Sequence, residues 1–86
     1  MMDENKLREF LEANPDYHEV LQRAVAYEEQ HANEEYFTGW IFAVRATDKQ
    51  FRELVYKGIV EMGFGTGRLI EYRLADRELT KKVLRP

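Results

Sequence analysis

Residues 47–74 read TDKQFRELVYKGIVEMGFGTGRLIEYRL, and this stretch decides the fold. Thr47 and Gln50 have the spacing of a capping box, in which the hydroxyl accepts a hydrogen bond from the third residue and the glutamine side chain reaches back to the cap. The apolar side chains that follow recur on one helical face. Gly58 can supply the left-handed conformation with which helices commonly end. The stretch therefore predicts a helix over residues 47–57.

Two segments rich in β-forming side chains follow this helix, at residues 59–64 and 69–74. The glycines of the segment GTGR, residues 65–68, provide the positive φ that hairpin turns need. The pattern predicts an antiparallel hairpin. Its repeated glycines also match part of a dinucleotide-binding fingerprint, but a strand follows them where that fingerprint requires a helix.

Helical periodicity also precedes the deciding stretch. Leu7, Phe10 and Leu11 predict a first helix over residues 3–13. Asn14 is a strong N-cap and Pro15 is favoured in a first helical turn, so a second helix is predicted to begin here and to run to about residue 31. Its apolar stripe consists of Tyr17, Val20, Leu21, Ala24 and Val25.

Residues 36–44 form a dense apolar run that fits either a short buried strand or a short buried helix. We favour a helix over residues 39–45 and place the run, including the single Trp40, in the core. Residues 76–84 predict a closing helix with Asp76 near its cap.

The chain has 86 residues and a net charge of −3, which fit one small domain. Residues 1–35 carry three basic and ten acidic side chains, whereas residues 36–86 carry ten basic and six acidic ones. The asymmetry favours an anionic partner for the second half, although a merely solvated helical surface explains it as well. No apolar run reaches the length of a membrane span. The absence of cysteine fits a reducing interior, so we expect a cytoplasmic protein.

Several kinds of chemistry are disfavoured. His18 and His31 are about 20 Å apart along one predicted helix, so they cannot share a metal ion. The cluster Glu28, Glu29, His31, Glu34 and Glu35 could collect a hard cation, but a solvated helix face is the expected role of such a run. No set of side chains suits nucleophilic or acid–base catalysis. We expect no enzyme, no metal site and no cofactor.

The segments WIFAVRA, TDKQFRELVYKG, GIVEM and GFGTGRLIEYRLAD together resemble the winged helix-turn-helix superfamily over about residues 36–84. The ending is similar to winged-helix modules attached to archaeal ATPases and helicases. The resemblance implies a small α+β winged-helix domain, with N-terminal helices followed by a recognition helix and a C-terminal β-hairpin wing. Residues 36–86 would form its core, and the helices of residues 1–35 would pack on it or extend it.

In that superfamily the capped helix generally enters the major groove of DNA while the wing touches the backbone or the minor groove. The resemblance thus implies a non-catalytic protein that binds double-stranded DNA, as in transcription regulation. Helix 47–57 would be the recognition helix. Gln50 could reach base edges only if its cap role is relaxed, and Glu53 and Glu71 would repel phosphates. The candidate DNA-binding residues are Lys49, Gln50, Arg52, Tyr56, Lys57, Arg68 and Arg73.

The same layout also serves protein recognition. The chain could instead be a protein-interaction or dimerisation module of a larger nucleic-acid or ATPase machine. In that case the acidic helices of residues 3–32 would dock on a basic partner or on a second copy of the chain. The doubled methionine at the start is compatible with an excised piece of a longer protein.

Overall fold

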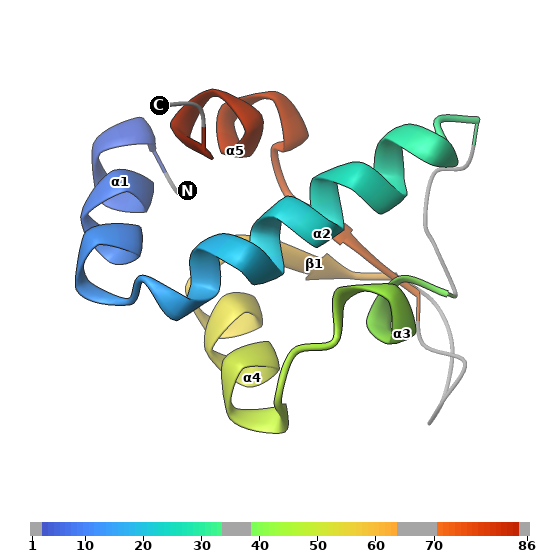
Figure 1. Ribbon diagram of the computed structural model, residues 1–86, viewed down its shortest axis with the longest axis horizontal. Helices are drawn as coiled ribbons and strands as arrows, with labels where there is room; N and C mark the ends of the chain where they lie inside the picture. The colour runs from blue at the N-terminus through green and yellow to red at the C-terminus, as the bar shows by residue number, and fades with distance from the viewer. Residues whose placement is uncertain (1–2, 34–38, 64–70, 85–86) are drawn as a thin grey trace.

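The computed structural model describes residues 3–33, 39–63 and 71–84 (Figure 1). Within them, five helices and one two-stranded antiparallel sheet form a small α+β domain. Helix α2 runs through the middle of the molecule, with α5 above it and α3 and α4 below it in this view. The elements are α1 (Glu4–Ala13), α2 (Asp16–Gln30), α3 (Trp40–Val44), α4 (Asp48–Tyr56), β1 (Val60–Met62), β2 (Tyr72–Leu74) and α5 (Arg77–Leu84).

Helix α4 has the ends that the sequence predicts. The backbone N–H of Gln50 donates to Thr47 Oγ1 at 3.1 Å, and the backbone N–H of Thr47 donates to Gln50 Oε1 at 3.0 Å. The capping box is therefore confirmed. Gly58 has a φ of +77°, the left-handed conformation expected of a residue that stops a helix. Leu54 lies on the inner side of α4 and is fully buried.

The predicted antiparallel pairing is confirmed for β1 and β2, in which Val60 stands opposite Leu74 and Met62 stands opposite Tyr72. Val60, Tyr72 and Leu74 are buried, so one face of the sheet belongs to the core. The predicted turn, including Arg68, lies outside the described residues.

The end of α1 differs from the prediction. Asn14 does not cap α2, because both its backbone N–H and its side-chain Nδ2 donate to the carbonyl of Phe10, each at 2.9 Å. Asn14 therefore closes α1, and Pro15, which already has helical φ and ψ, precedes α2 without a side-chain cap. At the other end of the chain the predicted cap of α5 is confirmed, since the N–H of Leu79 donates to Asp76 Oδ1 at 3.0 Å.

Helix α3 confirms the predicted short helix, but it does not bury the whole apolar run. Trp40 and Val44, four residues apart, are fully buried, whereas Phe42 is 68% exposed. The prediction that the run belongs to the core is wrong for Phe42, because residue 42 lies about 200° around the helix from residue 40 and so faces away from α2. Tyr36 and Phe37 lie outside the described residues.

One hydrophobic core joins both halves of the chain. The apolar stripes of α1 and α2 are used within it, against α3, the sheet and α5. Its buried side chains are Leu7, Phe10, Leu11, Tyr17, Val20, Leu21, Ala24, Val25, Trp40, Val44, Leu54, Ile59, Val60, Tyr72, Leu74 and Val83.

Candidate nucleic-acid interface

The solvent side of α4 carries most of the predicted DNA-binding residues. Lys49, Arg52 and Tyr56 are exposed and follow one another at helical spacing, on the side of α4 opposite Leu54. Tyr56 is 85% exposed, which makes it the most exposed large hydrophobic residue in the described part of the chain. Lys57 ends the helix and is also exposed.

The basic residues of α5 and β2 are engaged within the fold. Lys81 pairs with Glu29 at 2.5 Å and Lys82 with Glu4 at 2.8 Å, so α5 is neutralised by the acidic helices α1 and α2. Three ion pairs, those of Arg77, Lys81 and Lys82, thus join the basic second half of the sequence to the acidic first half. The cations held in ion pairs are Arg8, Arg23, Arg73, Arg77, Lys81 and Lys82.

The cations without an ion pair gather elsewhere. Among residues 3–33, 39–63 and 71–84 these are Lys6, Arg45, Lys49, Arg52 and Lys57. All except Lys6 lie on α4 or on the turn that leads into it. Four of the five described cations without an ion pair thus lie on α4 or its entry, a segment that also carries the acidic residues Asp48 and Glu53.

Arg45 was missed by the sequence reasoning. It ends α3 with a φ of 57°, the left-handed conformation that non-glycine residues rarely adopt, and its side chain is exposed. The available signal was its position two residues before the Thr47 cap, in the turn of a helix-turn-helix pattern.

Two other candidate DNA-binding residues, Gln50 and Arg73, are hydrogen-bonded within the fold. The cap role of Gln50 is not relaxed, and its Nε2 also donates to Asp16 Oδ2 at 2.8 Å, so both ends of its amide are engaged. Arg73 Nε donates to Glu61 Oε2 at 2.9 Å across the sheet, and its side chain is about one-third exposed. The structure does not bring Arg73 onto the face of α4.

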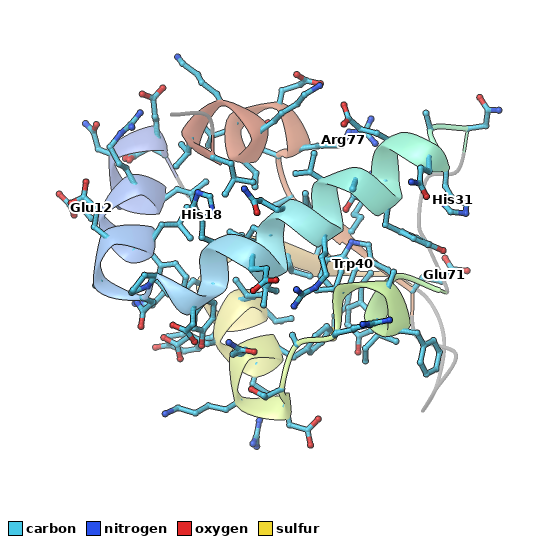
Figure 2. All side chains as sticks on the ribbon, viewed as in Figure 1. Glu12, His18, His31, Trp40, Glu71 and Arg77 are labelled. Carbon is cyan, nitrogen blue, oxygen red and sulfur yellow. The ribbon has the colours of Figure 1, made fainter. Side chains whose placement is uncertain are left out.

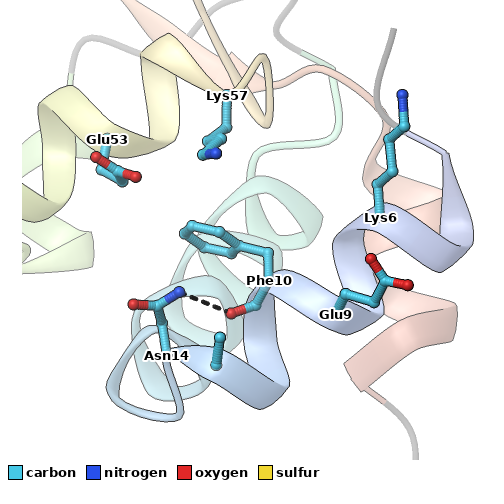
Figure 3. A pocket seen from close by; sticks show the side chains of 7 residues that line it. Lys6, Glu9, Phe10, Asn14, Glu53 and Lys57 are labelled. Atoms are coloured by element: carbon cyan, nitrogen blue, oxygen red, sulfur yellow. Dashed lines mark hydrogen bonds between the residues drawn. The ribbon is translucent and has the colours of Figure 1, made fainter.

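The two carboxylates expected to repel phosphates do not stand at the centre of that face. Glu53 is half-buried and lines a groove of about 520 Å³ between α4 and α1, where Lys57 of α4 and Lys6 of α1 also lie (Figure 3). Figure 2 places Glu71 well to the side of α4. Glu71 therefore lies away from α4, whereas Glu53, four residues from both Lys49 and Lys57, lies at the edge of the exposed side that faces α1.

Glu28 is a buried structural residue, whereas the sequence pattern predicted that it belongs to a solvated acidic face. It is only 3% exposed, and its Oε2 accepts hydrogen bonds from Trp40 Nε1 at 2.9 Å and from the N–H of Leu74 at 2.7 Å. Its Oε1 lies 3.9 Å from the guanidinium of Arg77. Burial raises the pKa of Glu28, against the opposing effect of these donors. The carboxylate joins α2, α3, β2 and α5, a structural role for which the signal was its place on the apolar stripe of α2.

The described residues contain no group of three His, Cys, Asp or Glu side chains able to hold a metal ion. Figure 2 shows His18 and His31 at opposite ends of α2. No helix in the same residues is long and apolar enough to cross a membrane. Comparison with protein-family models, with curated proteins and with solved structures gives no match for this chain.

Proposed function

We propose that this protein binds double-stranded DNA, without catalysis, through the exposed face of α4. The observation that carries the proposal is the sorting of the cations: those of α5 and β2 are ion-paired, whereas those of α4 and its entry turn are not. The order of α3, turn, α4 and antiparallel strands also supports a winged-helix-like arrangement, in which the second helix of the turn meets DNA.

The proposed contact places α4 in the major groove. An α-helix with its side chains is about 10–12 Å across, which fits a major groove about 12 Å wide. Lys49 and Arg52 would meet phosphates or guanine edges, with Tyr56 beside them. Arg45 and Lys57 stand at the two ends of α4, where they would contact the phosphates that flank the groove.

A protein-interaction module is the second candidate. It is favoured by apolar side chains on the surface, since Phe42 is 68% and Met62 is 56% exposed. Dimerisation through the first two helices gains no support from the packing, because the apolar stripes of α1 and α2 are already used in the core. A protein partner would therefore bind at α3 and the sheet.

Fluorescence anisotropy with a random-sequence duplex at two salt concentrations tests the proposal. Four phosphate contacts predict a salt slope of about −3 to −4, and the double variant Lys49→Ala with Arg52→Ala should reduce its magnitude by about 2. The matched control is Lys81→Ala with Lys82→Ala, which removes the same charge from ion-paired positions on α5. This control should bind nearly as the unaltered protein does.

Two results would decide against the proposed geometry. Equal losses in both double variants would mean that only overall charge matters. If no duplex binds even at low salt, the DNA function is wrong and the protein-interaction function takes its place.

A further inference from the structure

A cleft opens beside α4, where α3, α4 and β2 meet. Its volume is about 400 Å³, it is distinct from the groove at α1, and it shares Arg52 with the exposed side of α4. It is lined by Ile41, Ala46, Asp48, Phe51, Arg52 and Tyr72.

The floor of the cleft is apolar and rigidly held. The rings of Phe51 and Tyr72 meet edge to face, with centroids 4.4 Å apart and planes at 83°. Behind them the ring of Trp40 lies 6.0 Å from that of Phe51 and is fixed by its hydrogen bond to Glu28. Tyr72 is only 6% exposed and Phe51 is half-buried, so the cleft offers mainly the exposed part of the Phe51 ring, held in place by Tyr72, as an apolar surface.

The rim of the cleft is charged. Arg52 Nε makes a long contact of 3.4 Å with the backbone carbonyl of Asp48, which brings the guanidinium and the Asp48 side chain to the same edge. Within the described residues Arg52 has no carboxylate partner. Both side chains are exposed and free to meet a ligand that carries a hydrogen-bond donor and a negative charge.

We propose that this cleft takes one unpaired nucleobase from a bound DNA strand. The inference rests on the proposed function and names the class of DNA: a duplex with an unpaired base in preference to a fully paired one. A nucleobase has an apolar face that can pack on the half-buried side chains Phe51, Ile41 and Ala46, and it is joined to a phosphate that Arg52 can bind. Arg45, the residue before Ala46, has no ion pair among the described residues and would contact a neighbouring phosphate.

The rim also predicts which base is preferred. The carboxylate of Asp48 accepts hydrogen bonds and therefore favours a base with an exocyclic amino group, such as cytosine, over thymine. Taking a base out of a paired stack is costly, whereas a bulged base has already left its pairing. The preference should thus appear for a one-nucleotide bulge.

Anisotropy titrations with three otherwise identical duplexes test the inference: fully paired, with one unpaired cytosine, and with one unpaired thymine. The cytosine bulge should bind about tenfold tighter than the paired duplex, since stacking on aromatic side chains contributes that order of affinity. The thymine bulge should fall between them.

Two variants locate the effect. Ala46→Leu fills the cleft and should abolish the advantage of the bulge while paired DNA binds as before. Asp48→Asn should remove the preference for cytosine over thymine. Circular dichroism checks that both variants fold. If Ala46→Leu does not fold, Asp48→Asn alone tests the inference: loss of the preference for cytosine supports the cleft, and retention contradicts it.

Each contrary result points to a different error. Equal affinity for bulged and paired duplexes overturns the cleft inference and leaves DNA binding intact. A bulge preference that survives in both variants also overturns it, because the bend of the DNA would then be what is recognised. Failure of every duplex to bind overturns the proposed function together with the inference.

Discussion

Replacing Glu28 with alanine is expected to lower the free energy of unfolding by about 2–4 kcal/mol. The change strips the partner from two buried donors, Trp40 Nε1–H and the backbone N–H of Leu74. Each buried donor left unsatisfied costs about 1–3 kcal/mol, and removing a buried charge offsets part of the sum. A protein of this length has a total stability of about 4–13 kcal/mol. The loss would therefore lower the melting temperature by roughly 10–25 °C.

Glu28→Gln is the matched control. Both hydrogen bonds fall on the same oxygen, Oε2, and an amide oxygen can accept two. The glutamine side chain can thus keep Trp40 and Leu74 satisfied, and it loses only the contact with Arg77 at 3.9 Å. We expect Glu28→Gln to lie within about 1 kcal/mol of the unaltered protein at neutral pH, which isolates the hydrogen bonds from the charge.

The two proteins should differ in their response to pH. Burial raises the pKa of Glu28 above its ordinary value of 4.5, although the bonds from Leu74 and Trp40 and the charges of Arg77 and Arg73 oppose the shift. The folded state then holds this proton more tightly than the unfolded chain does. The resulting stabilisation is complete below pH 4.5 and is lost as the pH rises through the raised pKa of Glu28.

Urea unfolding of the unaltered protein and of Glu28→Gln across the acidic range measures this difference. Surface carboxylates such as Glu4, whose pKa is lowered by its hydrogen bond to Lys82, contribute equally to both proteins and cancel. A difference that does not change with pH, or that grows towards neutral pH, would refute the assigned sign. If Glu28→Ala and Glu28→Gln lost the same free energy of unfolding, the hydrogen bonds from Trp40 and Leu74 would not be the cause of the loss.

Three further changes test single features. Thr47→Ala should cost about 1 kcal/mol of stability through loss of the capping box, whereas Thr47→Ser should restore it; thermal melts compare them. Gly58→Ala should cost about 1–2 kcal/mol of stability from backbone strain alone, because φ is +77° and nothing lies within 4 Å of the added Cβ. A higher melting temperature for Gly58→Asn than for Gly58→Ala would support this cause, since asparagine tolerates a positive φ better. Glu53→Gln should change the affinity for paired DNA by less than about twofold, because Glu53 faces the groove at α1; a severalfold gain in anisotropy titrations would place DNA on that side instead.

The elements that could be predicted from sequence are those with local causes. The capping box of Thr47 and the left-handed Gly58 act within a few residues, so their pattern survives whatever packs around them. The β-forming residues likewise predicted a strand that ends at residue 74, and its Tyr72 and Leu74 are buried. The prediction for Asn14 was wrong because its amide can take either of two local roles. It can cap the helix that follows or close the helix that precedes, and the direction in which the chain turns between the helices determines which role it takes.

The arrangement of charges at the site could not be predicted, because it depends on ion pairs between residues far apart in the sequence. Lys81 and Lys82 are neutralised by Glu29 and Glu4, residues from the opposite end of the chain. Glu28 offered a sequence signal, because an acidic residue four positions after Ala24 continues the apolar stripe of α2. Such a position predicts a buried carboxylate, and its partners Trp40 and Leu74 emerge only when three segments meet.

The charged side chains that line the two edges of α4 balance at each edge, so charge alone does not orient a bound duplex. The edge towards α1 mixes Lys6 and Lys57 with Glu9 and Glu53 in one groove. The edge towards α3 carries Arg52 at the mouth of the cleft, with Asp48 as its only acidic lining residue.

At about 0.1 M salt the Debye length is about 10 Å, shorter than the smallest extent of the molecule, 22 Å. The net charge of −3 is then largely screened from the ligand, and the charges within a few ångströms of the contact dominate. The proposed cleft requires a duplex that lies towards α3 and the sheet. That orientation brings its backbone to the rim formed by Asp48 and Arg52, so the weak overall charge of the protein and the proposed base-binding cleft are compatible with one docked arrangement.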